Sequence, residues 1–286
     1  QQVVNGLLTE DMLSVRASGT VNSVEITDEI YEDGVVTLTI RADVFPQEQQ
    51  CFAADYKKSM LITRATLLNR EQANIGQIYA LDKQLVTKLA SKLKASSQFI
   101  DTKLANKHKV AFSRYNQSFD TEQIKMLAKE LGERFDAQFV LFTEINDVSF
   151  GQDSLNGWSF WQEDEFNRQF NVSFYVYSAL TGEMLAEQHY QNKAPWQFGK
   201  RESVDLTSNT FWNSRYGQML SSTLDNAIID IDENMMCEQT RAKIVKVDGN
   251  EIVINVGSNQ GVQVNDSFTL LPSNHFKTQR GKMNSG

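Results

Sequence analysis

The sequence predicts an α+β protein built from three modules. The first 45 residues contain a strand of strict apolar–polar alternation, the middle of the chain combines strands with amphipathic helices, and the last part has short strands with tight turns. A length of 286 residues suits two or three domains, and 41% hydrophobic residues suffice for packed cores. We place the modules at residues 1–48, 49–238 and 239–286.

The first module is expected to be small, α+β and incomplete at its start. Residues 1–8 are interpreted as the end of a helix whose beginning is absent. A strand around Val24 leads into Asp33-Gly34, a dipeptide typical of hairpin turns. Residues 36–44 then alternate strictly, so one face of that strand is expected to be buried and the other wet.

The middle module begins after a polar joint at Pro46 and residues 47–50, where nothing apolar is available for burial. Apolar residues then recur at helical spacing in some segments and alternate or run continuously in others, which predicts an α+β domain. The expected elements are a strand at 59–68, a helix at 76–95, a helix at 120–135 capped by Asp120, a strand at 139–142, paired strands at 170–177 and 183–190, and a last helix at 214–233.

The third module is expected to be a small all-β, SH3-like barrel. Strands at 244–247 and 252–256 flank the turn Asp248-Gly249-Asn250, and a third strand is predicted at 262–268. Residues 275–286 are polar and basic, which predicts a disordered tail.

The two cysteines, Cys51 and Cys237, lie at the two ends of the central block. A disulfide closing that block would explain this placement, and disulfides belong to oxidising compartments such as the bacterial periplasm. The alternative is a pair of separate core cysteines. The chain begins with Gln1, so we interpret it as a mature protein or a fragment without its leader.

The net charge of −8 is concentrated at the start of the chain, because residues 1–50 contain nine acidic and two basic residues. An acidic first module argues against nucleic acid or anionic lipid as its partner. No apolar run approaches the roughly 20 residues of a membrane helix. The acids are either a partner-binding face or a solvated one, and the candidate binding residues are Glu25, Asp28, Glu29 and Glu32.

The sequence contains no recognisable catalytic, nucleotide-binding or zinc-binding motif. His108, His189 and His275 are far apart in sequence, and no pair of ligands has the spacing of a zinc site. The acidic run 163–165 would suit a cation, or it is a solvated loop. We therefore expect no enzyme activity, no cofactor and no metal.

All four tryptophans fall in or near two long polar segments, at 150–168 and 194–216. Large aromatic side chains on loops often anchor protein interfaces. The alternative is that they cover the end of the sheet as a satellite core. The candidate partner-binding residues are Trp158, Trp161, Trp196 and Trp212.

Three stretches give the chain a family resemblance. They run from Ala17-Ser18-Gly19-Thr20-Val21 to Ile40-Arg41-Ala42-Asp43-Val44-Phe45, from Cys51-Phe52-Ala53 to Lys58, and over Arg241-Ala242-Lys243-Ile244. With these stretches the chain resembles the flagellar assembly protein T family, FlgT, over nearly its whole length. The resemblance implies a middle domain similar to the N-terminal domain of TolB.

The same resemblance implies a periplasmic structural protein of the H-ring, which surrounds the basal body of a sodium-driven polar flagellum. It also implies that the first module helps to recruit MotX and MotY of the neighbouring T-ring, while the middle module builds the H-ring as an oligomer. The alternative from another class is a periplasmic regulator that binds and activates a cell-wall synthase.

We predict that Cys51 and Cys237 form a disulfide, because both lie at the ends of the central block of an exported protein. Mass spectrometry of a non-reduced digest is expected to find the two cysteine peptides linked, and reduction is expected to separate them. Two free thiols in periplasmic material would contradict both the bridge and the compartment.

Overall fold

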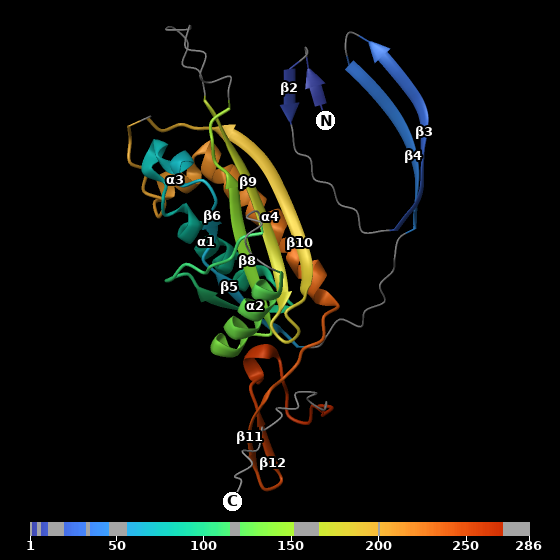
Figure 1. Cartoon of the computed structure of the whole chain (residues 1–286), viewed down its shortest axis with the longest axis vertical. Coiled ribbons are helices and arrows are strands. Elements are labelled where there is room, and N and C mark those ends of the chain that lie inside the picture. The colour runs from blue at the N-terminus through green and yellow to red at the C-terminus, as the bar shows by residue number, and fades with distance from the viewer. Residues whose placement is uncertain are drawn as a thin grey trace, which may run out of the picture.

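The computed structural model describes residues 56–114, 121–151, 166–199 and 201–270, and the backbone of four strands between residues 2 and 45. Its centre is a six-stranded mixed sheet with helices on both faces (Figure 1). The α+β class predicted from the sequence is thereby confirmed.

The chain starts with a hairpin and not with a helix. Strands β1 (Gln2–Val4) and β2 (Leu7–Glu10) pair antiparallel, with Val4 opposite Leu7. The helix expected over residues 1–8 is therefore wrong. Asn-Gly, the dipeptide between the two strands in the sequence, is the strongest short hairpin signal, and eight residues are too few for a stable helix.

The second hairpin of the first module was predicted correctly. Strands β3 (Thr20–Glu32) and β4 (Val35–Phe45) pair antiparallel over their whole length, and Glu32 lies opposite Val35. The register shifts between Val21 and Ser23 and again between Ile26 and Asp28, which marks two bulges in β3. This two-stranded ribbon forms a sheet of its own.

The central sheet has the strand order β10-β9-β8-β5-β7, with β6 pairing to β8. Strands β5, β7 and β8 are parallel, whereas β9 and β10 add an antiparallel hairpin at one edge. The strands are β5 (Lys58–Thr63), β6 (Thr66–Leu67), β7 (Ile100–Ala105), β8 (Phe139–Asp147), β9 (Asn167–Ser178) and β10 (Met184–Pro195).

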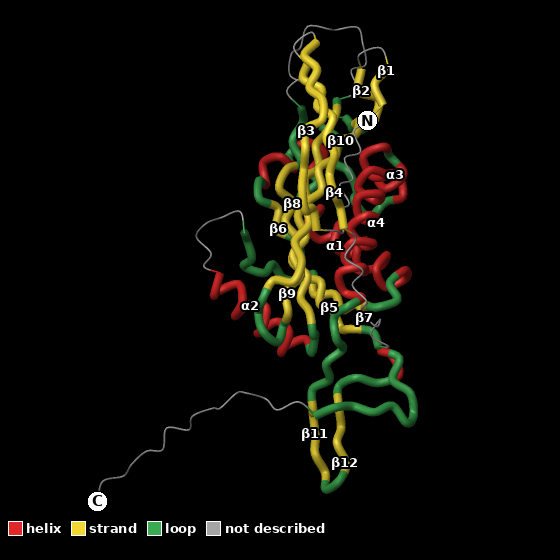
Figure 2. Tube along the Cα trace, turned by 90° about the vertical axis from the view of Figure 1, so that its right-hand side faces the viewer, coloured by secondary structure: helices red, strands yellow, loops and turns green. Residues whose placement is uncertain are grey.

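Helices cover the sheet unequally. Helices α1 (Leu81–Ser96), α3 (Asn209–Asn213) and α4 (Arg215–Met236) lie on one face, and α2 (Thr121–Phe135) lies on the other (Figure 2). The inner face predicted for the last helix is confirmed, because its apolar stripe is fully buried. Its members are Leu220, Leu224, Ala227 and Ile231.

The smaller core, beneath α2, is rich in aromatic rings. Phe112 stacks on Phe142 with ring centroids 4.2 Å apart, and Tyr175 and Tyr177 pack around them. Both tyrosines are at most 4% exposed. Strand β9 is thus buried on both faces, because α1 and α4 cover one side and this cluster covers the other.

The first part of the middle module differs from expectation in three ways. The helix expected at 76–95 starts only at Leu81, since the preceding chain forms two 3₁₀ turns, η1 (Arg70–Ala73) and η2 (Ile75–Gln77). Gly76 has a φ of 80°, a conformation outside the α-helix that glycine adopts readily. The strand expected at 59–68 is divided into β5 and β6. Strand β7 was not predicted at all.

Arg168, at the start of β9, is completely buried and holds three segments together. Its guanidinium donates hydrogen bonds to the carbonyl oxygens of Val148 (2.8 Å), Ile75 (3.0 Å) and Gln72 (2.6 Å). The cation also lies 4.4 Å from the ring centroid of Trp196. Further rings lie within 5.8 Å, those of Phe150 and Tyr216.

The third module shows one hairpin between residues 240 and 270. Strands β11 (Ile244–Asp248) and β12 (Glu251–Ile254) form a two-stranded sheet, followed by the turn η4 (Ser258–Gln260). The third strand expected at 262–268 is wrong, since that segment contains no strand. Without it, the described part of this module is not a barrel.

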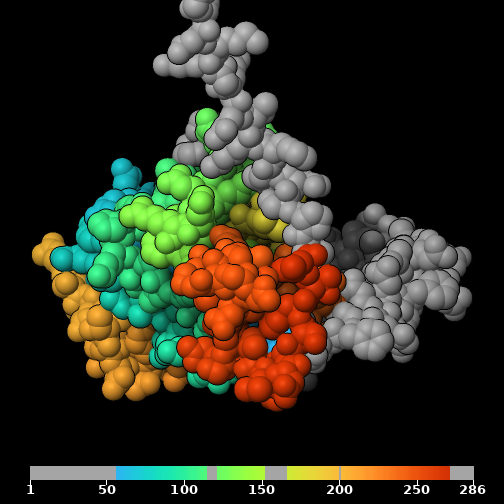
Figure 3. Space-filling view, turned by 90° about the horizontal axis from the view of Figure 1, so that it is seen from below, coloured from blue at the N-terminus to red at the C-terminus, as the bar shows by residue number. Residues whose placement is uncertain are grey.

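Hydrogen bonds attach this module to one end of the middle domain. The backbone N–H of Lys57 donates to Gln260 (2.8 Å), and the Gln260 side-chain amide donates to Asp101 (2.6 Å). Asn255 donates to Asp136 at the end of α2 (2.5 Å). Seen from below, the described residues of this module, up to residue 270 and drawn in red and orange, lie over this end of the domain (Figure 3).

We predict that Arg168→Met destabilises the middle domain by about 3–5 kcal/mol, because the substitution leaves three carbonyl groups, one buried and two partly buried, without donors. Urea unfolding followed by tryptophan fluorescence measures the change. Arg201→Met at an exposed position is the matched control and is expected to change stability by less than about 0.5 kcal/mol. Equal stabilities of the two variants would refute the role given to Arg168.

Candidate functional site

The four candidate acids of the first module all lie on β3. Glu25, Asp28 and Glu32 occupy positions opposite Arg41, Thr39 and Val35. Arg41, Thr39 and Val35 are separated by even numbers of residues, so they belong to the same face of β4. The three acids paired with them therefore share one face of the ribbon. The fourth candidate, Glu29, is paired with Leu38 and takes a position on the other face.

The second bulge in β3 produces this arrangement. With strict alternation, Glu25 and Asp28 would be on opposite faces, since they are three residues apart. The register shift between Ile26 and Asp28 adds one residue to β3 and brings both acids to the same face. The sequence alone does not reveal the register shift, because the apolar residues Val24, Ile26 and Ile30 keep an even spacing on both sides of the bulge.

The tryptophan candidates separate into different environments. Trp196 is 6% exposed and belongs to the larger core, where its ring packs against Tyr216 and Phe198. Trp196 is thus a core residue, but of the main core and not of a satellite core at the end of the sheet. Trp212 is half-buried at the surface end of that core. Trp158 and Trp161 lie outside the described residues, as does the acidic run 163–165.

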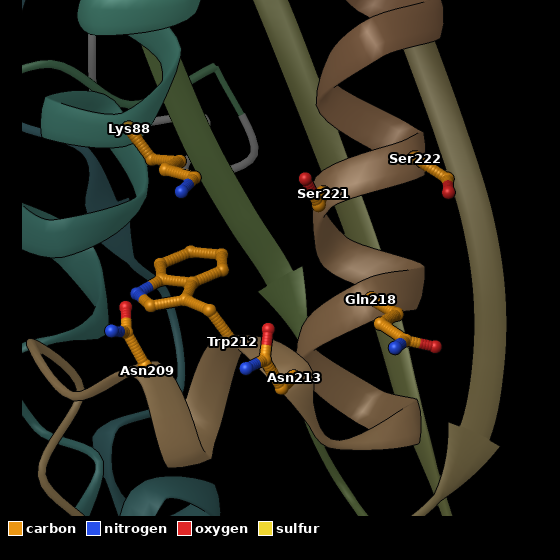
Figure 4. Close-up of a pocket in the computed structure, with 7 residues that line it drawn as sticks. All are labelled: Lys88, Asn209, Trp212, Asn213, Gln218, Ser221 and Ser222. Carbon is orange, nitrogen blue, oxygen red and sulfur yellow. The ribbon is translucent and has the colours of Figure 1, made fainter.

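Trp212 forms one wall of a surface groove between α1, α3 and α4 (Figure 4). Its indole N–H donates to the carbonyl oxygen of Leu206 (2.9 Å), which fixes the ring. The ammonium of Lys88 lies 5.1 Å from the ring centroid. The volume of the groove is about 450 Å³. The residues that line it are Lys88, Asn209, Trp212, Asn213, Gln218, Ser221 and Ser222.

A second polar cluster lies on the α2 side of strands β8–β10. Glu144 is fully buried, and its carboxylate accepts hydrogen bonds from the backbone N–H of Arg114 (2.9 Å) and the hydroxyl of Tyr175 (3.2 Å). The Arg114 guanidinium donates to the hydroxyl of Tyr177 (3.2 Å) and lies 4.0 Å from Glu187. The hydrogen bond to Tyr177 is the main reason that the pKa of Arg114 is raised.

His189, on β10, connects this cluster to a serine. Its Nδ1 is 2.7 Å from the hydroxyl oxygen of Ser173, and its Nε2 is 3.0 Å from Glu187. The Ser173 oxygen also accepts a hydrogen bond from Asn146 (2.6 Å). A serine, a histidine and a carboxylate in contact resemble a nucleophilic triad.

The surroundings of Ser173 favour a structural role. The residue is 1% exposed in the middle of β9, and it pairs with both Glu144 and His189 across the sheet. Its backbone is therefore part of the ladder and is not arranged as an oxyanion hole. The cluster satisfies buried polar groups and fixes the register of three strands.

Cys237 caps the C-terminus of α4 and is disulfide-bonded. The buried ammonium of Lys58 donates to the carbonyl oxygens of Met235 (2.7 Å) and Met236 (3.3 Å), so the start of β5 lies against the end of α4. Burial lowers the pKa of Lys58. Cys51 lies outside the described residues, so the pairing of the two cysteines stays a prediction.

The described residues hold neither a metal-binding cluster nor a membrane-spanning helix. Nowhere in residues 56–114, 121–151, 166–199 and 201–270 do three side chains of the metal-binding types come together as a metal site. None of the helices in these ranges is both long and apolar enough to cross a membrane.

These features define an α+β domain with a rigid core and surface grooves. The chain belongs to the flagellar assembly protein T family, because residues 49–206 match the model of that family's middle domain. Its role is therefore in the assembly of the bacterial flagellum and its basal body, and in motility. The α+β architecture agrees with the similarity to the N-terminal domain of TolB that the resemblance implied. No curated protein matches the chain significantly.

Three solved structures that resemble the chain do so at low identity. The hypothetical protein CT253 from Chlamydia trachomatis is 13% identical, with a TM-score of 0.43 over 64% of this chain and 99% of that one. The PelC dodecamer from Paraburkholderia phytofirmans is 11% identical, with a TM-score of 0.36 over 65% and 91%. Lipoprotein GNA1162 from Neisseria meningitidis is 10% identical, with a TM-score of 0.33 over 60% and 99%. Similarity at this level carries no conclusion about function.

We predict that Tyr175 makes the domain sensitive to alkaline pH. Burial, the largest cause, raises the pKa of this tyrosine from its usual value near 10 to about 12. Its contribution to stability is complete below pH 10 and is lost as the pH rises to about 12, because the unfolded chain releases the proton more easily.

Tyr175→Phe removes this titration, so the free energy of unfolding should fall less between pH 9 and pH 12 in the variant, by roughly 1–2 kcal/mol. Denaturant titrations at several pH values measure the slope. Tyr79→Phe, which removes a hydroxyl bonded to Asn74 at an exposed site, is the control. Parallel curves for wild type and Tyr175→Phe would contradict the assignment.

Proposed function

We propose that the protein is a non-enzymatic structural subunit of the flagellar basal body. In this proposal it is periplasmic, builds the H-ring as an oligomer, and supports the T-ring proteins MotX and MotY and thereby the stators. The observation that carries the proposal is the match of residues 49–206 to the middle domain of the flagellar assembly protein T family.

The hydrogen bonds of the middle domain suit a subunit that must keep its shape under mechanical force. Arg168 and the polar cluster around Glu144 connect strands and turns that are distant in sequence, which favours a stiff body over a mobile one. A stiff body with fixed surfaces is what a ring subunit requires, since every copy must present the same interface to its neighbours.

The sheet supplies two surfaces for contact between copies. Among the described strands, β7 and β10 each have only one partner and lie at opposite ends of the same sheet. Two different edges on one subunit allow head-to-tail contact, the arrangement from which closed rings are built. Exposed strand edges bind other chains readily through their unpaired backbone groups.

The first module is the part that engages the neighbouring ring. Three acids on one face of the β3–β4 ribbon, Glu25, Asp28 and Glu32, give this module a directed negative charge. Such charge accelerates the capture of a basic partner more than it adds to final affinity. MotX and MotY are the proposed partners of this face.

Charge reversal on the ribbon tests this assignment. The variant Glu25→Lys/Asp28→Lys/Glu32→Lys is expected to capture MotX and MotY at least fivefold more slowly, because it inverts the attraction during approach. Surface plasmon resonance measures the association rate. Cells with this variant should still build an H-ring but swim poorly, because fewer stators are held.

The matched control reverses three exposed acids of the middle domain, Glu130, Glu133 and Glu233, and should leave capture unchanged. Normal capture by the ribbon variant would show that the acidic face is only solvated. Sedimentation with purified basal bodies tests the ring itself. A protein that stays in the supernatant would overturn the ring proposal and favour a regulator of a cell-wall synthase.

A further inference from the structure

The groove at Trp212 has a composition that the flagellar role does not explain. Six of its seven lining residues are polar, and none of them is acidic. The groove is formed by parts of the chain that are distant in sequence, with Lys88 on α1 and the others on α3 and α4. Figure 4 shows the indole lying between Lys88 and Asn209, with Asn213 and Ser221 nearby.

The polar side chains of the groove have unused hydrogen-bonding capacity. Asn209, Asn213, Gln218 and Ser222 are exposed, and among the described residues none of their side chains takes part in a hydrogen bond. Amide and hydroxyl groups can both donate and accept. The groove therefore offers several neutral donors and acceptors around one aromatic ring.

The charged and apolar residues of the groove are too few for an anionic or an apolar ligand. Lys88 is the single charged residue in the lining, and its ammonium already lies over the indole. A site for an anionic ligand usually contains several cationic side chains. A site for an apolar peptide usually contains several apolar side chains. Neither set is present in this lining.

We propose that this groove binds an uncharged saccharide. The apolar C–H face of a sugar ring packs against an indole, and its hydroxyl groups exchange hydrogen bonds with neutral amides and hydroxyls. Trp212 supplies the aromatic surface, where the sugar would displace the Lys88 ammonium from the indole, and Gln218 and Ser222 supply polar contacts from α4. A volume of about 450 Å³ falls in the usual range for ligand sites.

The fixed orientation of the indole favours such a role. Trp212 is held by its hydrogen bond to Leu206 and by edge contact with Phe211, whose ring centroid is 5.2 Å away. A preorganised aromatic platform loses little entropy when a ligand stacks on it. The groove is open to solvent, so we expect a dissociation constant on the order of 1 mM.

Titration of the full-length ¹⁵N-labelled chain with chitotetraose, and separately with cellotetraose, tests the proposal. The indole N–H resonance of Trp212, assigned by its absence in Trp212→Phe, is expected to shift saturably with at least one of the two sugars. No saturable shift at about ten times the expected dissociation constant with either sugar overturns the proposal.

Variants separate binding from folding. Gln218→Ala/Ser222→Ala changes two exposed positions and is expected to weaken binding at least fivefold, whereas Asn234→Ala, an exposed amide elsewhere on α4, leaves it unchanged. Unaltered affinity in the double variant overturns the assignment to this groove. Co-sedimentation with insoluble cell-wall glycan then distinguishes a polymeric source from a free saccharide, and either source supports the proposal.

Discussion

The buried guanidinium of Arg168 is the interaction on which the middle domain depends. It joins the 3₁₀ turns at Gln72 and Ile75, the end of β8 at Val148 and the start of β9, although these segments are far apart in sequence. No carboxylate neutralises it in the described structure; carbonyl dipoles and aromatic faces surround the cation instead. Removing a charge from water is expensive, so such a site requires nearly complete coordination. The positions of Trp196 and of the turns before α1 follow from this requirement.

Local periodicity was enough to predict much of this fold. The apolar stripe of α4 and the alternation in β4 are properties of neighbouring residues, and the structure has both elements where the pattern places them. Elements that depend on distant partners could not be read in this way. Strand β7 is short and mixed in polarity, and it is a strand because β5 pairs with it. The segment at 262–268 has an alternating pattern but no partner strand among the described residues.

Chemistry at the candidate sites was harder to predict than secondary structure. Arginine is mostly an exposed residue in proteins and tyrosine is often partly exposed, so residue type gave no reason to expect the burial of Arg168 or of the β9 tyrosines. Tyr175 and Tyr177 are instead buried, because their rings complete the α2-side core while their hydroxyl groups reach Glu144 and Arg114. The groove at Trp212 is assembled from two separate parts of the chain, so only the tryptophan itself was visible in the sequence.

The bulge between Ile26 and Asp28 shows how a local irregularity decides which residues share a face of a strand. Composition establishes that the first module is acidic, but composition does not establish whether that charge is directed. One additional residue in β3 places Glu25 on the same face as Asp28 and Glu32, and leaves Glu29 on the other. An uneven distribution of acids between the two faces orients an approaching partner, whereas an even distribution would only attract it. In the proposed role, the middle domain would provide a stiff body and the acidic ribbon would orient a partner.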